Sequence, residues 1–378
     1  MKRFLIVTSL IHTKDENRYF GYGPYINEMN IWLKYVKQLD ILAPLEKRNV
    51  TPIDLPYEFD NVNFKKVDSF SFTTVKSRVI SFFKLPIIFW QIFVAMRQAD
   101  HIHLRCPGNI GLIGCIVQVF FPYKNKTAKY AGNWDPNSNQ PWTYKLQKRI
   151  LSNSFLTRNM QVLVYGEWEN QSKNIKPFFT ATYHESEKVI VEKSKIDLGV
   201  KFIFVGSLVT GKNPMYAVKL IQELIKKGHN ATLEMYGEGV ERNILEKYIQ
   251  TNYLDNHIFL KGNQNKETLK EAYIKSHFVI LPSISEGWPK AIAEGMFWGC
   301  MPIGTKVSCV PYMVDGGERG ILLEMEINKD AQQLENVVLD DKMFEDKSTK
   351  ALYWSRNYTL NVFQEEIKKI LLPNIITD

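Results

Sequence analysis

The feature that most constrains the fold of this 378-residue chain is an alternation of short apolar runs with segments of helical period. In the second half, the runs KFIFVGS, ATLEMYG, HIFLKG and HFVILPS alternate with segments such as NPMYAVKLIQELIKKG, VERNILEKYIQTN and KETLKEAYIKS. This pattern predicts parallel strands joined by helices, because parallel strands need crossover connections and are buried on both faces. The chain is therefore expected to be α/β, with Rossmann-like doubly wound sheets.

The first half shows the same alternation. Residues 3–9, residues 40–43 and the runs ADHIHLRC and KTAKYAG predict strands, and Ile26, Met29, Leu33 and Val36 have the spacing of a helix. A polar stretch over residues 187–200 separates this cycle from the next one. We predict a first domain over residues 1–190 and a second over residues 191–355, which agrees with the prior of roughly 100 to 200 residues per domain. Two such sheets facing each other leave a cleft at the carboxyl ends of their strands, where ligands usually bind.

The amino-terminal stretch MKRFLIVTSLIHTKDE resembles a secretion signal, because Lys2 and Arg3 precede an apolar run. That run stops after about nine residues and no small-residue cleavage site follows, so we predict a strand instead. The apolar residues 79–96 are interrupted by Lys84 and Pro86, and residues 110–122 are too few for the roughly 20 that a membrane span needs. The four cysteines form no CxxC pair, which favours a reducing compartment. A cytoplasmic location is expected.

The basic residues are concentrated in the first half of the chain. Residues 1–190 contain 25 Lys and Arg against 15 Asp and Glu, whereas residues 191–378 contain 23 against 25. A solvated basic surface would explain this, and so would a surface that faces anionic lipid. Aromatic and basic residues alternate over residues 75–98, which is typical of a helix on the inner face of the cytoplasmic membrane. No zinc-finger spacing or RNA-recognition signature indicates a nucleic-acid partner.

The stretch SEGWPKAIAEG, residues 285–295, follows a predicted strand and contains two carboxylates eight positions apart. Pro289 suits the first position of a helix, where its missing N–H needs no partner. The free N–H groups of Gly287, Trp288 and Lys290 would then hold a diphosphate with the positive end of the helix dipole.

Glu294 would lie about 7.5 Å along this helix at 1.5 Å per residue, roughly the step from a diphosphate to its ribose. A carboxylate on so apolar a helix needs donors, and two ribose hydroxyls would supply them. Glu286, before the turn, would contact a sugar at the other end. The plainer alternatives are that Glu286 caps the helix and that Glu294 pairs with a lysine.

A cation is predicted at the end of another strand in the same domain. The stretch KFIFVGSLVTGKNP gives a strand, Gly206, a short loop and Lys212 before the next helix. A lysine in this position can neutralise a diphosphate leaving group, although a solvated loop lysine is the simpler interpretation of the motif alone.

Together the stretches FVGSLVTGKNP, LEMYGEG, residues 258–305 and YWSRNYTLNVFQEEIKKIL resemble the carboxyl half of family 4 retaining glycosyltransferases. The resemblance covers about residues 200–372. It implies the GT-B architecture of two Rossmann-like domains, with a C-terminal helix over residues 356–378 that packs toward the first domain. It also implies that Glu286 contacts the donor sugar, Glu294 the ribose hydroxyls and Lys212 the diphosphate, with Gly237 near the base.

The sequence departs from this family at two places. Many members have Arg where Ser207 follows Gly206, so the second diphosphate cation is missing, and Lys290 or Arg105 would have to compensate. The histidine of the first domain is also missing, and Asn133 is the residue that would hydrogen-bond a sugar hydroxyl in its place. Gly23 precedes Pro24 at a helix start, where members have a glycine loop near the donor; an ordinary flexible loop is the alternative.

The strand HIHLRCPGN carries His101, His103 and Arg105 on one face. Two histidines without a third ligand do not predict a metal, and no Asp-x-Asp element does either. Arg105, the last residue on that face, is placed to bind acceptor or phosphate. A dinucleotide fingerprint would need glycine where Ile26 stands, which argues against hydride transfer.

These observations predict a retaining glycosyltransferase that moves a sugar from a UDP- or GDP-sugar to a sugar hydroxyl, without metal or cofactor. The basic, aromatic-rich first half favours a lipid-linked acceptor of surface polysaccharide or lipopolysaccharide synthesis. Two other hypotheses remain at this point: a nucleotide-sugar epimerase of similar architecture, and a non-catalytic carbohydrate-binding scaffold.

Overall fold

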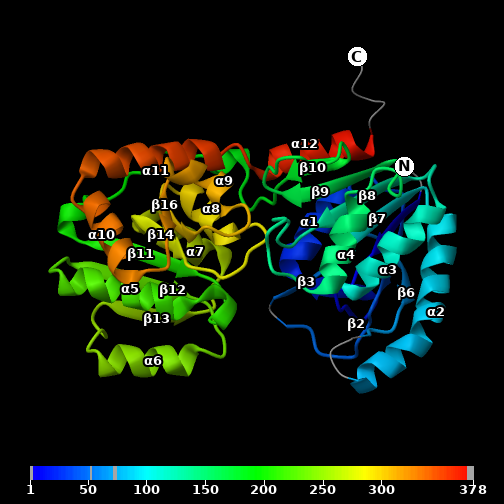
Figure 1. Cartoon of the computed structure of the whole chain (residues 1–378), viewed down its shortest axis with the longest axis horizontal. Helices are drawn as coiled ribbons and strands as arrows, with labels where there is room; N and C mark the ends of the chain where they lie inside the picture. The colour runs from blue at the N-terminus through cyan, green and yellow to red at the C-terminus, as the bar shows by residue number, and fades with distance from the viewer. Residues whose placement is uncertain (1–2, 52, 71–74, 373–378) are drawn as a thin grey trace, which may run out of the picture. The chain divides into compact units, whose positions relative to one another are not determined.

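The computed structural model describes residues 3–51, 53–70 and 75–372. For residues 75–82, which begin a helix, it describes only the main chain. It divides into two compact units, residues 1–179 with 363–378, and residues 180–362. Each unit is built on its own sheet, as Figure 1 shows. The predicted α/β class with two doubly wound units is confirmed.

The first unit contains a seven-stranded parallel sheet in the order β10-β9-β8-β7-β1-β4-β6. Its strands are β1 (Arg3–Val7), β4 (Gln38–Ala43), β6 (Asn63–Lys66), β7 (His101–Cys106), β8 (Asn125–Tyr130), β9 (Met160–Tyr165) and β10 (Ile175–Phe178). A small antiparallel sheet joins β2 (Thr13–Asp15), β3 (Arg18–Tyr22) and β5 (Asp54–Pro56). Its helices are α1 (Gly23–Leu33), α2 (Val75–Gln98), α3 (Asn109–Val117), α4 (Trp142–Leu151) and most of α12 (Leu360–Leu371).

Alternate residues of the strands face opposite layers of helices. Leu5, Ile102 and Leu104 belong to the apolar core that includes residues of α2 and α3. The intervening side chains face α1, since Trp32 packs on Phe4 at 6.1 Å and on His103 at 4.6 Å between ring centroids. This period of two is the reason that a buried parallel strand can be apolar on one face and carry histidines on the other.

The second unit contains a six-stranded parallel sheet in the order β13-β12-β11-β14-β15-β16. The strands are β11 (Val200–Val205), β12 (Ala231–Tyr236), β13 (Ile258–Gly262), β14 (Phe278–Leu281), β15 (Met301–Thr305) and β16 (Ile321–Leu323). The helices are α5 (Pro214–Lys226), α6 (Arg242–Thr251), α7 (Lys266–Lys275), α8 (Lys290–Phe297), α9 (Val310–Met313), α10 (Ile327–Val338) and α11 (Asp341–Ser355). Every predicted strand and helix of this half is present.

The division between the units differs from the predicted boundary at residue 190. Residues 180–190 belong to the second unit, because the Tyr183 ring packs on Phe297 and Trp298 at 4.9 and 5.0 Å. Phe363 and the residues after it belong to the first unit, because the Phe363 ring packs on Phe178 at 5.4 Å.

The C-terminal region differs from the expectation in one respect. The acidic residues 335–346 lie mostly in α10 and α11, and the buried side chains of Leu334 and Phe344 pack these helices against the second unit. The final helix begins at Leu360 rather than at residue 356, after a break that follows Ser355. Residues 373–378 of the predicted helix lie outside the described residues.

Candidate active site

The candidate site of the second unit lies where the strand order of its sheet reverses. From β11 the chain adds β12 and β13 on one side, and it then adds β14, β15 and β16 on the other. β11 and β14 are therefore neighbours, and Phe202 pairs with Phe278 in the parallel register. Ligands of open α/β sheets bind outside the carboxyl ends of the strands at such a point. Gly206 follows β11 there, and Glu286 follows β14.

The loops after β11 and β12 are in close backbone contact. Gly237 has a φ of +142°, and a Cβ on it would lie 2.0 Å from the carbonyl oxygen of Gly206. The Leu208 amide donates to Glu238 O at 3.0 Å and extends this contact. Only glycine fits position 237, since any side chain would force the loops apart. The structure thus brings Gly206, Ser207 and Gly237 together at one edge of the sheet.

Lys212 and Glu286 form an ion pair, with 2.5 Å between Lys212 Nζ and Glu286 Oε1. Lys212 ends a short 3-10 turn (Thr210–Lys212) after β11, and the Ile284 amide donates to Gly211 O at 2.9 Å, which ties this turn to the loop after β14. The Glu286 side chain is 6% exposed and that of Lys212 is 30% exposed. The two predicted catalytic residues of this unit are therefore in contact, with the lysine facing solvent.

Helix α8 begins one residue later than predicted, with Pro289 as its N-cap. No side-chain hydrogen bond caps this helix, so Glu286 is not its cap. The amides of a first helical turn have no acceptor within the helix, and those of Lys290 and its neighbours lie at this start. The carbonyl of Gly287 accepts hydrogen bonds from Ser308 Oγ at 3.1 Å and Cys309 Sγ at 3.0 Å, which fix the turn before the helix.

The ring of Trp288 has a packing role. It is buried, stacks on Trp354 at 6.2 Å and meets Tyr358 edge-on at 5.5 Å. The aromatic contacts attach the start of α8 to α11, and the main-chain N–H of Trp288 is the group predicted to bind the donor.

Glu294 lies in the second turn of α8 and accepts hydrogen bonds from two hydroxyls. Its Oε1 accepts from Thr182 Oγ1 at 2.7 Å, and its Oε2 accepts from Tyr273 OH at 3.3 Å. Burial raises the pKa of Glu294, and the charge of Lys290, four residues earlier, opposes that shift. Among the described residues Glu294 forms no ion pair, so the lysine alternative does not apply. The Glu294 carboxylate is bonded by hydroxyls, which is the kind of donor that a ribose presents.

Ser207 is exposed and leaves the position of the usual arginine without a cation. Lys290 remains the candidate replacement within this unit, because it is the first residue of α8 and lines the small cavity beside Glu294. In the part of the chain that the structure describes, no carboxylate forms an ion pair with Lys290.

The other predicted site residues belong to the first unit. Arg105 is near the end of β7, with 3.6 Å between its guanidinium and Glu28 Oε1 and 5.2 Å between its guanidinium and the centre of the Tyr25 ring. Glu28 also pairs with the fully buried Lys129 at 2.8 Å. This buried carboxylate therefore holds Arg105 at the carboxyl edge of the first sheet.

Asn133 and Gly23 each lie in close contact with main-chain atoms of nearby residues. Asn133 follows β8, and its Oδ1 accepts from the Asp135 amide at 2.9 Å, which closes a local turn. Gly23 starts α1, and a Cβ there would lie 2.8 Å from Ile53 O. Pro24 lies in the first turn of α1 as predicted, and Gly23 allows close chain approach rather than forming a flexible loop.

Sequence reasoning missed Thr182 and Tyr273, the two hydroxyl donors to Glu294. Thr182 precedes the predicted boundary at residue 190, so it was assigned to the first domain, although it belongs to the second unit. Tyr273 is the aromatic residue of α7, and no motif surrounds it. A buried carboxylate needs hydrogen-bond donors, so the sequence indicated that Glu294 would have partners. It did not indicate which residues those partners are.

Residues 186–352 match the sequence model of glycosyl transferases group 1. The chain is a glycosyltransferase, and the matched residues contain Lys212, Glu286 and Glu294 within the second unit.

Individual relatives of the chain are distant in sequence. Protein CapJ of Staphylococcus aureus is 25% identical over 295 residues, which cover 75% of this chain and 73% of CapJ. The poly(glycerol-phosphate) alpha-glucosyltransferase of Bacillus subtilis is 24% identical over 162 residues, 42% of this chain and 24% of that protein.

A crystal structure of HepE from Anabaena in complex with UDP is similar to this chain, with a TM-score of 0.67 at 14% sequence identity. The similar region covers 98% of this chain and 99% of the HepE chain. This likeness confirms the GT-B fold. Other similar structures are longer, and the chain spans only 58–60% of three of them.

Proposed function

We propose that the protein transfers a glycosyl unit from a nucleotide-diphosphate sugar to a hydroxyl of a surface-polymer acceptor, with retention of anomeric configuration. The observation that carries the proposal is the contact of Lys212 with Glu286 at the point where the strand order of the sheet reverses, beside the start of α8. Retention is what the resemblance to family 4 implies.

The protein's contribution to the reaction is electrostatic. Negative charge develops on the diphosphate as its bond to the sugar breaks, and Lys212 and the start of α8 are placed to stabilise it. Glu286 orients the sugar by accepting hydrogen bonds from its hydroxyls, and Lys290 supplies the second cation that Ser207 does not. Precise placement of donor and acceptor supplies the rest of the acceleration.

Glu294 is proposed to bind the ribose of the donor. A carboxylate can accept about four hydrogen bonds, and Thr182 and Tyr273 account for two of them. Two positions remain, which matches the two vicinal hydroxyls of a ribose. UDP is the nucleotide supported by the HepE complex, and GDP is the alternative.

The acceptor is proposed to be a phosphate-bearing or lipid-linked surface polymer. The support is the similarity to an enzyme named poly(glycerol-phosphate) alpha-glucosyltransferase. Arg105 and Asn133 at the carboxyl edge of the first sheet would contact this acceptor.

The outer face of α2 supports contact with an anionic membrane. Phe83, Ile87 and Trp90 recur at helical spacing and are 71%, 62% and 64% exposed, and Arg97 follows in the last turn. None of the described helices combines the length and apolarity needed to cross a bilayer. We expect the chain to float with vesicles that contain phosphatidylglycerol, and the Phe83→Ser/Trp90→Ser variant to remain in the dense fraction. Equal flotation of both proteins would contradict a role for this face.

The reaction itself is tested by release of nucleoside diphosphate. The purified chain is incubated with UDP- and GDP-sugars, with and without a polymer acceptor, and the released nucleotide is measured. We expect release that depends on the acceptor. Conversion of the donor without an acceptor would indicate an epimerase or hydrolase, and no reaction with any donor would indicate a binding protein.

A further inference from the structure

A groove of about 520 Å³ lies on the first unit at the edge of the sheet opposite to Arg105. Its floor includes His101, Asn125 and Met160, which begin β7, β8 and β9. Parallel strands place all their amino ends at one edge, and a six-residue strand spans roughly 17 Å. The groove is therefore well separated from the carboxyl edge that carries Arg105 and Asn133.

Three exposed cations line the groove: Arg158, Lys173 and Lys176. No aspartate or glutamate is among its lining residues. Within the described residues, no carboxylate forms an ion pair with any of the three, whereas Lys129 and Lys212 are paired. An uncompensated cluster of this kind attracts an anion.

The buried polar groups at the floor of the groove are either uncharged or hydrogen-bonded to other groups of the protein. Burial lowers the pKa of His101 to about 3, so its ring is uncharged, and its Nε2 bonds to Thr127 Oγ1 at 2.9 Å. Lys126 Nζ donates to the carbonyls of Phe121 at 3.0 Å and Gln118 at 3.3 Å. A ligand would consequently meet the exposed cations rather than these buried groups.

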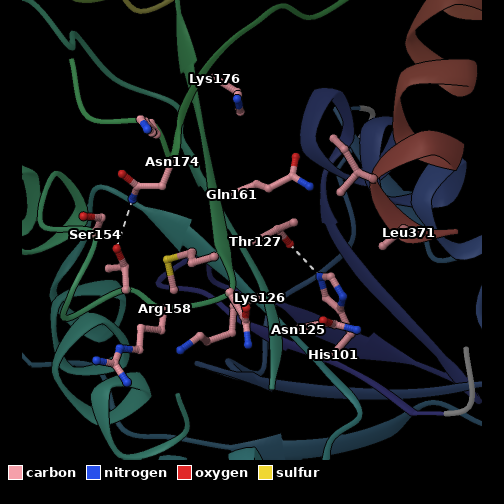
Figure 2. A pocket seen from close by; sticks show the side chains of 15 residues that line it. His101, Asn125, Lys126, Thr127, Ser154, Arg158, Gln161, Asn174, Lys176 and Leu371 are labelled. Carbon is pink, nitrogen blue, oxygen red and sulfur yellow. Dashed lines mark hydrogen bonds between the residues drawn. The ribbon is translucent and has the colours of Figure 1, made fainter. Parts of the chain in front are cut away.

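The remaining lining residues provide both polar and apolar contacts. Figure 2 shows Leu371 of α12 on one side of the groove, Asn174 and Ser154 on the other, and Gln161 between them. Ile370 and Met160 add apolar surface. Cations beside amide groups and apolar side chains suit a chain in which phosphates alternate with polyol or sugar units.

We propose that this groove binds phosphodiester groups of the acceptor polymer, away from the site of transfer. The inference rests on the proposed function in taking that polymer as the ligand. A hollow volume of about 520 Å³ accommodates a strand of polymer, whereas a bilayer surface would meet projecting side chains such as those of α2. The groove would then increase affinity for long acceptors without taking part in the chemistry.

The test is calorimetric binding of a synthetic glycerol phosphate oligomer to the full chain, without donor. In one variant Arg158, Lys173 and Lys176 are each changed to Gln. In the matched control the exposed Lys37, Lys47 and Lys66 of the same unit are changed to Gln, which removes the same charge. We expect the first variant to bind about ten-fold more weakly and the control to bind like the native chain, with all affinities falling as salt rises.

In transfer assays, the groove variant should raise KM for the oligomer and leave kcat unchanged, since the contact is the same in ground and transition states. Equal weakening in both variants would show a general charge effect and overturn the proposal, as would unchanged binding in the groove variant. Binding of phosphatidylglycerol vesicles through these cations without binding of the oligomer would also overturn it. If the oligomer binds through the groove but no sugar is transferred, the proposed function fails and the groove assignment stands.

Discussion

Lys212→Ala is expected to reduce kcat about 10²- to 10³-fold, which is the typical effect of removing one group that stabilises developing charge. The reason is the position of Lys212 Nζ, 2.5 Å from the buried Glu286 and partly open to solvent in the 3-10 turn that follows β11. Its contribution grows as charge builds on the diphosphate, so kcat should fall more than donor affinity. The measurement is the initial rate of nucleoside diphosphate release at saturating donor and acceptor.

The substitution also leaves Glu286 buried without its partner, which would lower the free energy of unfolding by about 2 kcal/mol. A double variant, Lys212→Ala/Glu286→Gln, removes the unpaired charge and should recover thermal stability without recovering turnover. Lys201→Ala serves as the matched control, because Lys201 is exposed near the opposite end of β11. A folded Lys212→Ala protein with native kcat would show that Lys212 does not stabilise the leaving group.

Much of the fold followed from periodicity alone. The strands of the second unit are nearly all apolar runs bounded by glycine or polar residues, so β11, β12, β13 and β14 appear where the sequence predicts them. The antiparallel sheet of β2, β3 and β5 was not predicted, because β2 and β5 have only three residues each and such short strands carry little periodic signal. The break after Ser355 was missed for a related reason, since no proline or glycine marks it.

The candidate site was predictable where it depends on strand ends and glycines. Gly206, Gly237 and Lys212 stand at positions that the parallel sheet brings together, and the short distance from Gly237 to Gly206 explains why glycine is required. Long-range partners were not predictable. Glu28 holds Arg105, and it is 77 residues away along the chain, on a helix whose sequence gives no sign of a buried ion pair.

The remaining prediction concerns Glu294→Gln, which we expect to weaken nucleotide binding about 10- to 100-fold while the protein stays at least as stable. The carboxylate would accept both ribose hydroxyls through charge-assisted hydrogen bonds, whereas the neutral amide offers a single weaker acceptor. Thr182 can still donate to the amide oxygen, so the local structure should persist. Calorimetric titration with UDP and GDP measures the loss, and Glu271→Gln on the exposed side of α7 is the control.

The pH dependence separates this role from a structural one. Burial places the folded-state pKa of Glu294 above its unfolded value, so in the interval between them the folded state holds a proton that the unfolded state has lost. The free energy of unfolding therefore decreases as pH rises through that interval, and the Gln variant, which cannot ionise, should lack the decrease. Nucleotide affinity should follow the opposite course, rising in the native chain as Glu294 ionises and staying flat in the variant. A variant that loses stability and affinity together would instead assign Glu294 to holding Thr182 and Tyr273 in place.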